Sequence, residues 1–326
     1  MLKNDVLKIL LSNKSHISGQ EISKRLNVSR TAVWKAVSSL KNEGYIIESI
    51  NNRGYLLIQK NDVLNQVEIE QSMHKDFKSP KVIYLNTVDS TNNYAKSLSD
   101  CEPEDFLVVS DTQTLGKGRR GRNWVSPSGV GIWMSLCIRP QILIEHASMI
   151  TLVMALSVCE AIEDLYSLEC NIKWPNDIIA DEKKLGGILT EMSADLDGVR
   201  YVVCGIGLNV NNECFKEENL KYAVSLFNIT QKKYPRKKLI YCITEKFLKY
   251  SELIFKAGDL KPVKDRYEAL LINTGRRVKI LGDKDKFEAV AEGITDKGCL
   301  RVLKDNGEAA YILSGEVSIR GVYDYI

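Results

Sequence analysis

The stretch Asp111-Thr-Gln-Thr-Leu-Gly-Lys-Gly-Arg-Arg-Gly-Arg-Asn-Trp124 lies between two predicted strands, and the rest of the chain is organised around it. Within it, the run from Gly116 to Arg122 holds three glycines and four cations in seven consecutive positions. Glycine lets the backbone approach a ligand, and Lys and Arg supply charge-assisted hydrogen bonds to phosphate or carboxylate oxygens. The stretch therefore predicts an anion-binding loop. It is not a P-loop, because Gly118 follows Lys117 where Ser or Thr should bind magnesium.

The segments on either side of this loop predict an α+β domain with a mixed, largely antiparallel sheet. A helix is expected to start near Tyr94, after a cluster of Asp, Ser and Thr that suits both a helix cap and a polar ligand. Long helices are expected over about 148–167 and 238–256. The predicted strands are 81–86, 106–110, 131–138, 171–180, 184–192 and 200–210.

Several kinds of chemistry find no support in the sequence. The run Gly205-Ile-Gly207 is not a dinucleotide fingerprint, because position 210 is Val and no third glycine opens a helix. A histidine-based triad is disfavoured in a chain with three histidines. The eight cysteines contain no CxxC pair, so neither a metal site nor a disulfide framework is predicted. The residues that remain suit nucleotide binding and neutralisation of charge at a phosphoryl centre.

The N-terminal segment differs from the rest in charge. Residues 1–60 hold ten Lys/Arg and four Asp/Glu, a net charge of +6, whereas the whole chain is +3. Helices capped by Ser18 and Ser29, followed by two strands around Asn51-Asn-Arg-Gly54, predict a winged helix-turn-helix. A helical protein-docking domain is the alternative. The charge and the hairpin favour DNA binding, through Ser29, Arg30, Thr31, Trp34, Lys35 and Arg53.

Beyond Thr274-Gly275, short strands broken by Gly-containing turns predict a small SH3-like β-barrel. We therefore expect three domains: residues 1–62, 63–272 and 273–326, with 59–80 as a linker that holds at most a short helix. No signal peptide and no membrane-length apolar run is found, so a cytoplasmic location without membrane contact is predicted.

Taken together, these motifs resemble those of the bacterial biotin–protein ligases, and with the N-terminal module they resemble the bifunctional members that also repress the biotin operon. The resemblance covers essentially the whole chain. It is carried by Asp89-Ser-Thr-Asn92, Gln113, Gly116-Lys-Gly-Arg-Arg-Gly-Arg122, Lys173-Trp-Pro-Asn-Asp177, Lys184-Leu-Gly-Gly187 and Gly205-Ile-Gly-Leu-Asn209. It implies a class II synthetase-like catalytic domain of the biotin/lipoate ligase type.

The resemblance also implies two half-reactions. Biotin and ATP give biotinyl-5′-AMP, which then transfers biotin to a lysine of a biotin carboxyl carrier protein. Mg²⁺ would arrive with ATP, held by phosphates and a carboxylate such as Asp177, without a dedicated metal site. Biotinyl-5′-AMP would be the corepressor, and the loaded protein would bind operator DNA as a homodimer. Two alternatives stay open: a lipoate–protein ligase, and a ligand-sensing transcription factor without ligase turnover.

Site residues follow from the resemblance, position by position. Arg119 and Lys184 are the expected catalytic residues. Lys117 stands where many members of the family have Arg, which leaves its role less defined. Biotin is expected to contact Ser90, Thr91, Asn92, Gln113, Gly116, Lys117, Gly118, Arg119, Lys184 and Gly187. The nucleotide is expected to contact Arg119, Arg120, Arg122, Trp133, Lys173, Asn176, Asn209, Glu316 and Arg320.

Overall fold

A computed structural model describes residues 2–59, 62–73, 79–195, 198–215, 220–282, 286–314 and 317–321. The chain divides into two compact units, Met1–Ser72 and Met73–Ile326. The predicted boundary at residue 62 lies ten residues before this division. Among the described residues, no helix is long and apolar enough to cross a membrane.

The first unit has the predicted order of a winged helix-turn-helix. Ser18 and Ser29 cap their helices as predicted, each accepting a hydrogen bond from the backbone N–H three residues on. The antiparallel hairpin turns at Asn51–Arg53, and Gly54 has a φ of 100° that favours glycine. Its elements are α1 (Leu2–Ser12), α2 (Gly19–Leu26), α3 (Arg30–Asn42), β1 (Ile46–Ile50), β2 (Gly54–Gln59) and α4 (Gln66–Ser72).

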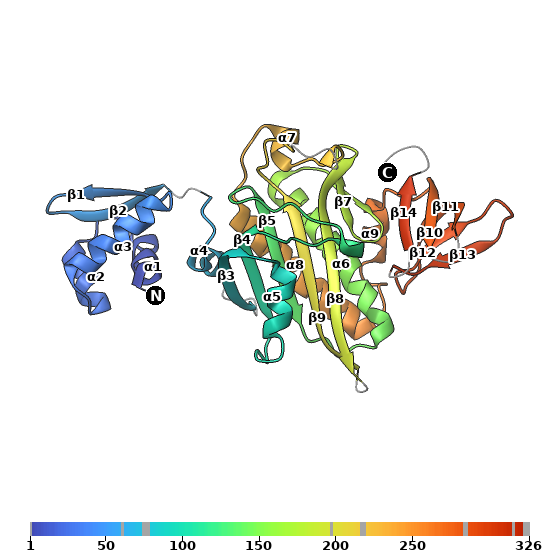
Figure 1. Ribbon diagram of the computed structural model, residues 1–326, viewed down its shortest axis with the longest axis horizontal. Helices are drawn as coiled ribbons and strands as arrows, with labels where there is room; N and C mark the ends of the chain where they lie inside the picture. The colour runs from blue at the N-terminus through green and yellow to red at the C-terminus, as the bar shows by residue number, and fades with distance from the viewer. Residues whose placement is uncertain are drawn as a thin grey trace. The chain divides into compact units, whose positions relative to one another are not determined.

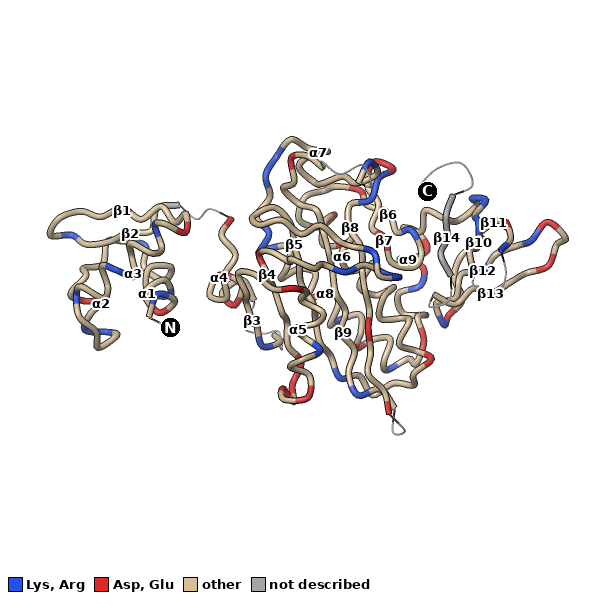
Figure 2. The backbone as a smooth tube through the Cα atoms, viewed as in Figure 1, with Lys and Arg blue, Asp and Glu red and all other residues tan. Residues whose placement is uncertain are grey.

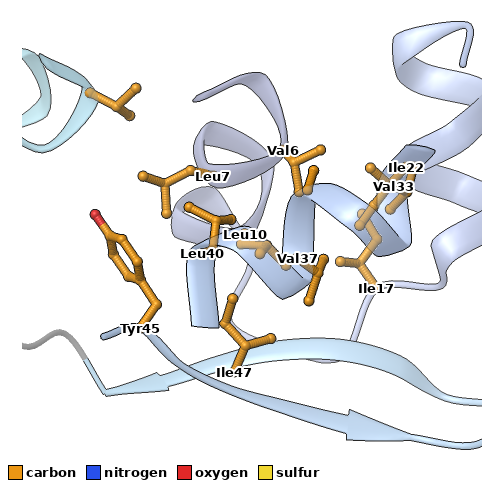
Figure 3. Packing of buried hydrophobic residues seen from close by; sticks show 12 residues of the cluster. Val6, Leu7, Leu10, Ile17, Ile22, Val33, Val37, Leu40, Tyr45 and Ile47 are labelled. Atoms are coloured by element: carbon orange, nitrogen blue, oxygen red, sulfur yellow. The ribbon is translucent and has the colours of Figure 1, made fainter. Parts of the chain in front are cut away.

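Apolar side chains from each element meet in the core of this unit. Figure 3 shows Leu7 and Leu10 of α1 beside Leu40 of α3, and Val6 of α1 on the side of Val33 and Ile22. Full burial of one such side chain is worth about 1.5–3 kcal/mol. Helix α4 lies in the predicted linker, but it contributes the buried Val67 to the same core. The segment after residue 62 is therefore packed against the first unit as well as connecting it to the second.

The second unit is built on a seven-stranded sheet of order β3-β4-β5-β9-β8-β7-β6 (Figure 1). Only the β3–β4 pair is parallel, which confirms the prediction of a mixed, largely antiparallel sheet. The strands are β3 (Lys81–Val88), β4 (Phe106–Gln113), β5 (Gly131–Ile138), β6 (Asn171–Lys173), β7 (Asp177–Ala180), β8 (Lys183–Asp195) and β9 (Gly198–Asn209).

Helices cover both faces of this sheet, so the central strand β5 is buried along its whole length. Helix α5 packs on β4, β5 and β9, and brings Ala95 against Cys137 and Val203. Because side chains alternate along a strand, Ser135 faces α5 and its neighbours face the other layer. That layer contains α6 and α8, which pack on each other. The helices of this unit include α5 (Thr91–Leu98), α6 (Ala147–Tyr166), α7 (Leu226–Thr230), α8 (Arg236–Ala257) and α9 (Lys264–Leu270).

The prediction of one strand over 171–180 is wrong. The segment is a hairpin, with β6 and β7 pairing antiparallel around Trp174, Pro175 and Asn176. Proline has no N–H to donate to a strand ladder, so the strand ends before it. The turn is held by Asn273, whose Oδ1 accepts a hydrogen bond of 2.8 Å from the Trp174 backbone N–H. This reversal places Asn176 and Asp177 beside β8.

The C-terminal segment forms a five-stranded antiparallel sheet of order β13-β12-β11-β10-β14. Pairing between β13 and β14, which would close it into a barrel, is not seen among the described residues. The sheet is attached to the rest of the second unit partly by Trp174, whose indole Nε1 donates to the Gly298 carbonyl. Its strands are β10 (Arg277–Gly282), β11 (Lys286–Ile294), β12 (Leu300–Leu303), β13 (Ala309–Ile312) and β14 (Val317–Gly321).

Candidate active site

Thr91 and Gln113 form one side of the candidate site, where the start of α5 meets the end of β4. Gln113 Oε1 accepts from the Thr91 backbone N–H at 2.8 Å and from the Thr91 hydroxyl at 3.0 Å. Gln113 Nε2 donates to Ser126 Oγ at 2.8 Å. Both ends of the Gln113 amide are thereby oriented by the protein. Residues 22 positions apart are brought together, as the resemblance implied.

Ser90 and Asn92 flank Thr91 and are both buried. Ser90 is the N-cap of α5. The Asn92 amide donates to the Leu189 carbonyl at 3.1 Å and to Glu191 Oε2 at 2.8 Å. Its oxygen lies 2.6 Å from Ser135 Oγ. The polar atoms of the Asn92 side chain are thus engaged by the protein, which favours a supporting role beneath the site over direct ligand contact.

The basic loop is closed by its own backbone. The Gly118 N–H donates to the Arg122 carbonyl at 2.7 Å, and the Trp124 N–H donates to the Gly116 carbonyl at 2.8 Å. Arg120 and Gly121 have φ values of 56° and 70°, so the chain reverses through the left-handed region. A Cβ on Gly116 would lie 2.3 Å from the Trp124 carbonyl oxygen. Glycine at this position is therefore required by the close approach of the two arms.

Arg119 is the arginine of this loop that turns inward. Its Nη1 donates to Asn176 Oδ1 at 2.9 Å, and its Nη2 donates to the Ser314 carbonyl beyond β13. Burial lowers the pKa of the guanidinium, and Asp177 opposes that shift. Arg120 and Arg122 are exposed. The loop thus directs one of its three arginines to the hairpin that carries Asn176.

Lys117 and Lys184 supply two further cations. Lys117 Nζ donates to Asn93 Oδ1 at 3.1 Å, on the first turn of α5. Lys184 Nζ forms a 2.7 Å ion pair with Asp177 and lies 5.3 Å from the centre of the Trp124 ring. The Lys184 side chain keeps 27% of its surface exposed. It can therefore reach an incoming anion while Asp177 and the indole orient it.

Glycines on β8 and β9 make room for the Trp124 indole. A Cβ on Gly207 would lie 2.3 Å from Trp124 Nε1, and one on Gly187 would lie 3.2 Å from Lys184 Cε. Gly187 and Gly207 are paired across the two strands. The indole therefore lies against bare backbone and presents its remaining surface beside Lys184. Trp124 was not among the predicted site residues, although it ends the stretch that predicted the loop.

We expect Gly207→Ala to displace the indole, because the new methyl group cannot coexist with it. Nucleotide affinity should fall at least about tenfold, with a stability loss of about 1–3 kcal/mol. Isothermal calorimetry and thermal denaturation measure the two effects. Ile206→Val is the control, because this buried neighbour faces the other layer and should lower stability by about 0.5–1.5 kcal/mol. Equal nucleotide affinity in Gly207→Ala and wild type would contradict a contact between the Trp124 indole and the nucleotide.

The remaining predicted nucleotide contacts lie in different surroundings. Trp133 is fully buried and donates to the Pro127 carbonyl at 3.1 Å, which favours a structural role over stacking on a base. Lys173 is buried on β6. Asn209 donates to the Val224 carbonyl at 3.2 Å. Glu316 lies outside the described residues, and only the backbone of Arg320 is described, paired with Lys279 in the C-terminal sheet.

The first unit has a candidate DNA-binding surface of its own. Arg30, Thr31 and Lys35 are exposed on α3, and Trp34 keeps 58% of its surface exposed. Arg53 is exposed in the turn between β1 and β2. Figure 2 shows basic positions on the helices of this unit and at the hairpin turn. Ser29 uses its hydroxyl to cap α3 through the Ala32 N–H. The predicted recognition side chains therefore share the polar face of α3, opposite the core residues Val33, Val37 and Leu40.

These geometries define a class of protein. Unit two places Lys184 beside the Trp124 indole, Arg119 on Asn176, and Lys117 on the helix that carries Thr91. Cations around a cluster of polar side chains are expected of an enzyme that joins a carboxylate to a nucleotide phosphate. Unit one has the form of a helix-turn-helix DNA-binding domain. The class is a ligase that carries its own DNA-binding domain.

Comparison with known proteins identifies the particular family. Residues 84–209 match the Biotin/lipoate A/B protein ligase family, residues 3–56 match the HTH domain, and residues 274–320 match the Biotin protein ligase C terminal domain. The Bifunctional ligase/repressor BirA of Bacillus subtilis (strain 168) is 35% identical over 98% of both chains. That of Escherichia coli (strain K12) is 28% identical over 95% of both chains.

A solved structure agrees with the sequence relatives. The biotin protein ligase from Aquifex aeolicus in complex with biotin and ATP has a TM-score of 0.64 at 33% identity, and the match covers 74% of this chain and 99% of that chain. The chain belongs to the family of bifunctional biotin ligase/repressors: it is a biotin–protein ligase with a DNA-binding repressor domain.

Proposed function

We propose that the site in the second unit joins biotin and ATP into biotinyl-5′-AMP and then transfers biotin to a lysine of a carboxyl carrier protein. The observation that carries the proposal is the position of Lys184. Its ammonium lies beside both Asp177 and the Trp124 ring, with Arg119 hydrogen-bonded to the neighbouring Asn176. A carboxylate that attacks an α-phosphate adds negative charge at one point, and cations held in place there stabilise it.

The polar pocket is assigned to biotin. Thr91 and Gln113 have the hydrogen-bonding groups that a cyclic urea requires, and Ser90 and Asn92 shape the start of α5 around them. The biotin carboxylate would point toward Lys184. The rest of the proposed biotin site is Gly116, Lys117, Gly118, Arg119 and Gly187.

The nucleotide is assigned to the surface between Trp124 and the 171–180 hairpin. The indole offers a flat apolar surface to a base, and Arg119 with Asn176 borders the phosphates. Asn209 and Lys173 are buried close to the strand ends, and we assign them to the walls of this site. Exposed Arg120 and Arg122 would contribute charge when the loop meets ATP. Trp124 replaces Trp133 as the proposed stacking residue, and Glu316 and Arg320 remain predictions.

We propose that Mg²⁺ binds this site together with ATP. Among the described residues, no group of three or more His, Cys, Asp or Glu is placed to hold a metal ion. Asp177 is engaged with Lys184. The ion would neutralise phosphate charge when it arrives with the nucleotide, and Asp177 is the carboxylate near enough to Lys184 and Arg119 to share in holding it.

The protein with bound biotinyl-5′-AMP is proposed to bind operator DNA as a homodimer. Strand β7 pairs with β8 only as far as Gly187, whereas β9 pairs with β8 through Asp195. Beyond Leu189, β8 therefore has one open edge among the strands that the structure describes, and Met192 on it is 46% exposed. An open edge can pair with the same edge of a second copy. The three-domain division and the cytoplasmic location also stay proposals.

The ligase proposal is tested by biotin-dependent exchange of labelled pyrophosphate into ATP, followed by labelling of a purified carrier domain. We expect exchange with biotin and none with lipoate. Exchange that requires lipoate would assign the site to the lipoate alternative. DNA binding that depends on biotin, without any exchange, would assign the chain to the ligand-sensing alternative.

Selection from a random duplex library tests the DNA proposal. In the presence of biotin and ATP we expect an inverted-repeat site, because a two-fold dimer reads two half-sites. Lys35→Ala should weaken binding about tenfold and lower the salt dependence by about one ion. Lys14, outside α3, provides the control substitution Lys14→Ala. A single unrepeated site, bound by a monomer in sedimentation, would contradict the dimer.

A further inference from the structure

Glu191 links strand β8 to the helix that borders the biotin pocket. Its Oε1 accepts from Lys96 Nζ at 2.6 Å, and its Oε2 accepts from Asn92 Nδ2 at 2.8 Å. Asn92 and Lys96 lie one turn apart on α5. The Glu191 side chain keeps 30% of its surface exposed, and Lys117 of the basic loop has a weaker, electrostatic effect that lowers the pKa of the Glu191 carboxyl. No part of the proposed reaction yet accounts for it.

The carboxylate decides which way the Asn92 amide faces. Nδ2 has two protons, and they go to Glu191 Oε2 and to the Leu189 carbonyl. Both of these groups only accept hydrogen bonds, so the reversed amide would set oxygen against oxygen at two positions. The Asn92 oxygen is thereby directed at Ser135, over Gly205, where a Cβ would lie 2.1 Å from it.

The orientation of Asn92 in turn decides the direction of two hydroxyl groups. Ser135 Oγ is fully buried and lies 2.6 Å from Asn92 Oδ1 and 2.7 Å from Thr91 Oγ1. A hydroxyl has one proton to donate. Asn92 Oδ1 can only accept, so the single Ser135 proton goes to it and not to Thr91. The Thr91 proton then has two acceptors within reach, Ser135 Oγ at 2.7 Å and Gln113 Oε1 at 3.0 Å.

When Thr91 donates to Ser135, its Oγ1 presents acceptor lone pairs beside a second acceptor. Gln113 Oε1 lies 3.0 Å away, and its orientation is held by Ser126 at the other end of the amide. Two acceptor oxygens at this spacing suit a ligand N–H. When the Thr91 proton is donated to Gln113 Oε1, as in the 3.0 Å hydrogen bond of this structure, the pair offers less to such a donor.

We propose that Glu191 is a positioning residue for biotin, which directs the hydrogen bonds Thr91→Ser135→Asn92→Glu191 and so makes the Thr91 hydroxyl an acceptor for a ureido N–H. The proposal rests on the assignment of the pocket to biotin. This series of hydrogen bonds requires the Glu191 carboxyl to be ionised. Burial raises the pKa of that carboxyl, but hydrogen bonds from Lys96 and Asn92 outweigh burial and hold the pKa below its ordinary value.

Glu191→Gln tests this direction, because the amide has an oxygen at only one of the two carboxylate positions. It therefore cannot accept from Lys96 and Asn92 at separate oxygens, as Glu191 does. We expect the Kd for biotin to rise about tenfold, while the KM for ATP at saturating biotin changes less than about twofold. Ser135→Ala interrupts the same chain at its middle and should raise the Kd by a similar factor. Loss of structure alone would not separate biotin from ATP in this way.

A double-mutant cycle with Thr91→Val decides whether Glu191 acts through the Thr91 hydroxyl. In the Thr91→Val background, Glu191→Gln should change the Kd for biotin by less than about twofold. Unchanged biotin affinity in Glu191→Gln, or a loss that adds in full to that of Thr91→Val, would overturn the proposal. If the wild-type protein fails to bind biotin, the assignment of the pocket fails as well, so the two failures are distinguishable.

Discussion

Replacing Lys184 with methionine is expected to slow biotin-dependent pyrophosphate exchange about 10²–10³-fold, the loss typical for one preorganised charge at a reacting centre. Methionine preserves much of the length and apolar surface of the lysine stem. It removes the ammonium that lies 2.7 Å from Asp177 and faces the Trp124 ring. The rate constant for adenylate formation in a single turnover measures the effect directly.

Two further measurements make the Lys184 result specific. Lys183→Met is the matched control, because Lys183 is the preceding residue on β8 and is exposed. It should exchange at the wild-type rate. Lys184→Met should change the affinity for biotin less than it changes the rate of adenylate formation. The reason is that the ammonium is proposed to stabilise charge that develops during the reaction. A rate within a factor of about three of wild type would remove Lys184 from the catalytic residues.

Arg119→Gly is expected to release biotinyl-5′-AMP at least about 100-fold faster than wild type, corresponding to the loss of about two charge-assisted hydrogen bonds. Arg119 connects the loop to Asn176 and to the Ser314 carbonyl, so glycine detaches the loop from both. Released adenylate is a mixed anhydride that reacts with exposed lysines. Labelling of an unrelated bystander protein should therefore appear together with the faster release.

Arg119→Lys separates the charge of this residue from its shape. Lysine can contact one partner, but it lacks the planar fork that reaches Asn176 and Ser314 together. We expect Arg119→Lys to retain biotinyl-5′-AMP longer than Arg119→Gly does, but less long than the wild type. Retention in Arg119→Gly equal to that of the wild type, measured by filter binding of labelled adenylate, would show that the loop is held by its other contacts.

Local signals were enough to predict the first unit. The caps at Ser18 and Ser29, the apolar spacing of α3 and the turn before Gly54 all act within a few residues, so they can be read from the sequence. The same holds for β5, whose predicted bounds of 131–138 are confirmed. The prediction of one strand over 171–180 is wrong because the apolar residues of this segment suggest a continuous strand, whereas Pro175 interrupts it.

The candidate site was predictable only in part. A cation-rich loop is visible because its charges are consecutive, and the resemblance supplied Thr91, Gln113 and Lys184. Trp124 was missed, since its partners Gly187 and Gly207 are more than 60 residues away. Glu191 was missed for the same reason, because Asn92 and Lys96 are 99 and 95 residues from it. Nothing local distinguishes Glu191 from a solvated surface carboxylate.

By itself, the sequence determined the charged DNA-binding module, the mixed sheet and the anion-binding loop between Gly116 and Arg122. Only the tertiary structure decided what that loop contacts: Arg119 turns inward to Asn176, while Arg120 and Arg122 stay exposed. It also explains Gly205 and Gly207, which leave room for Asn92 and Trp124. The physical reason is the distance along the chain over which each interaction acts. Caps, turns and charge act between neighbours in the chain, whereas steric fit and the direction of a hydrogen bond depend on atoms that only folding brings together.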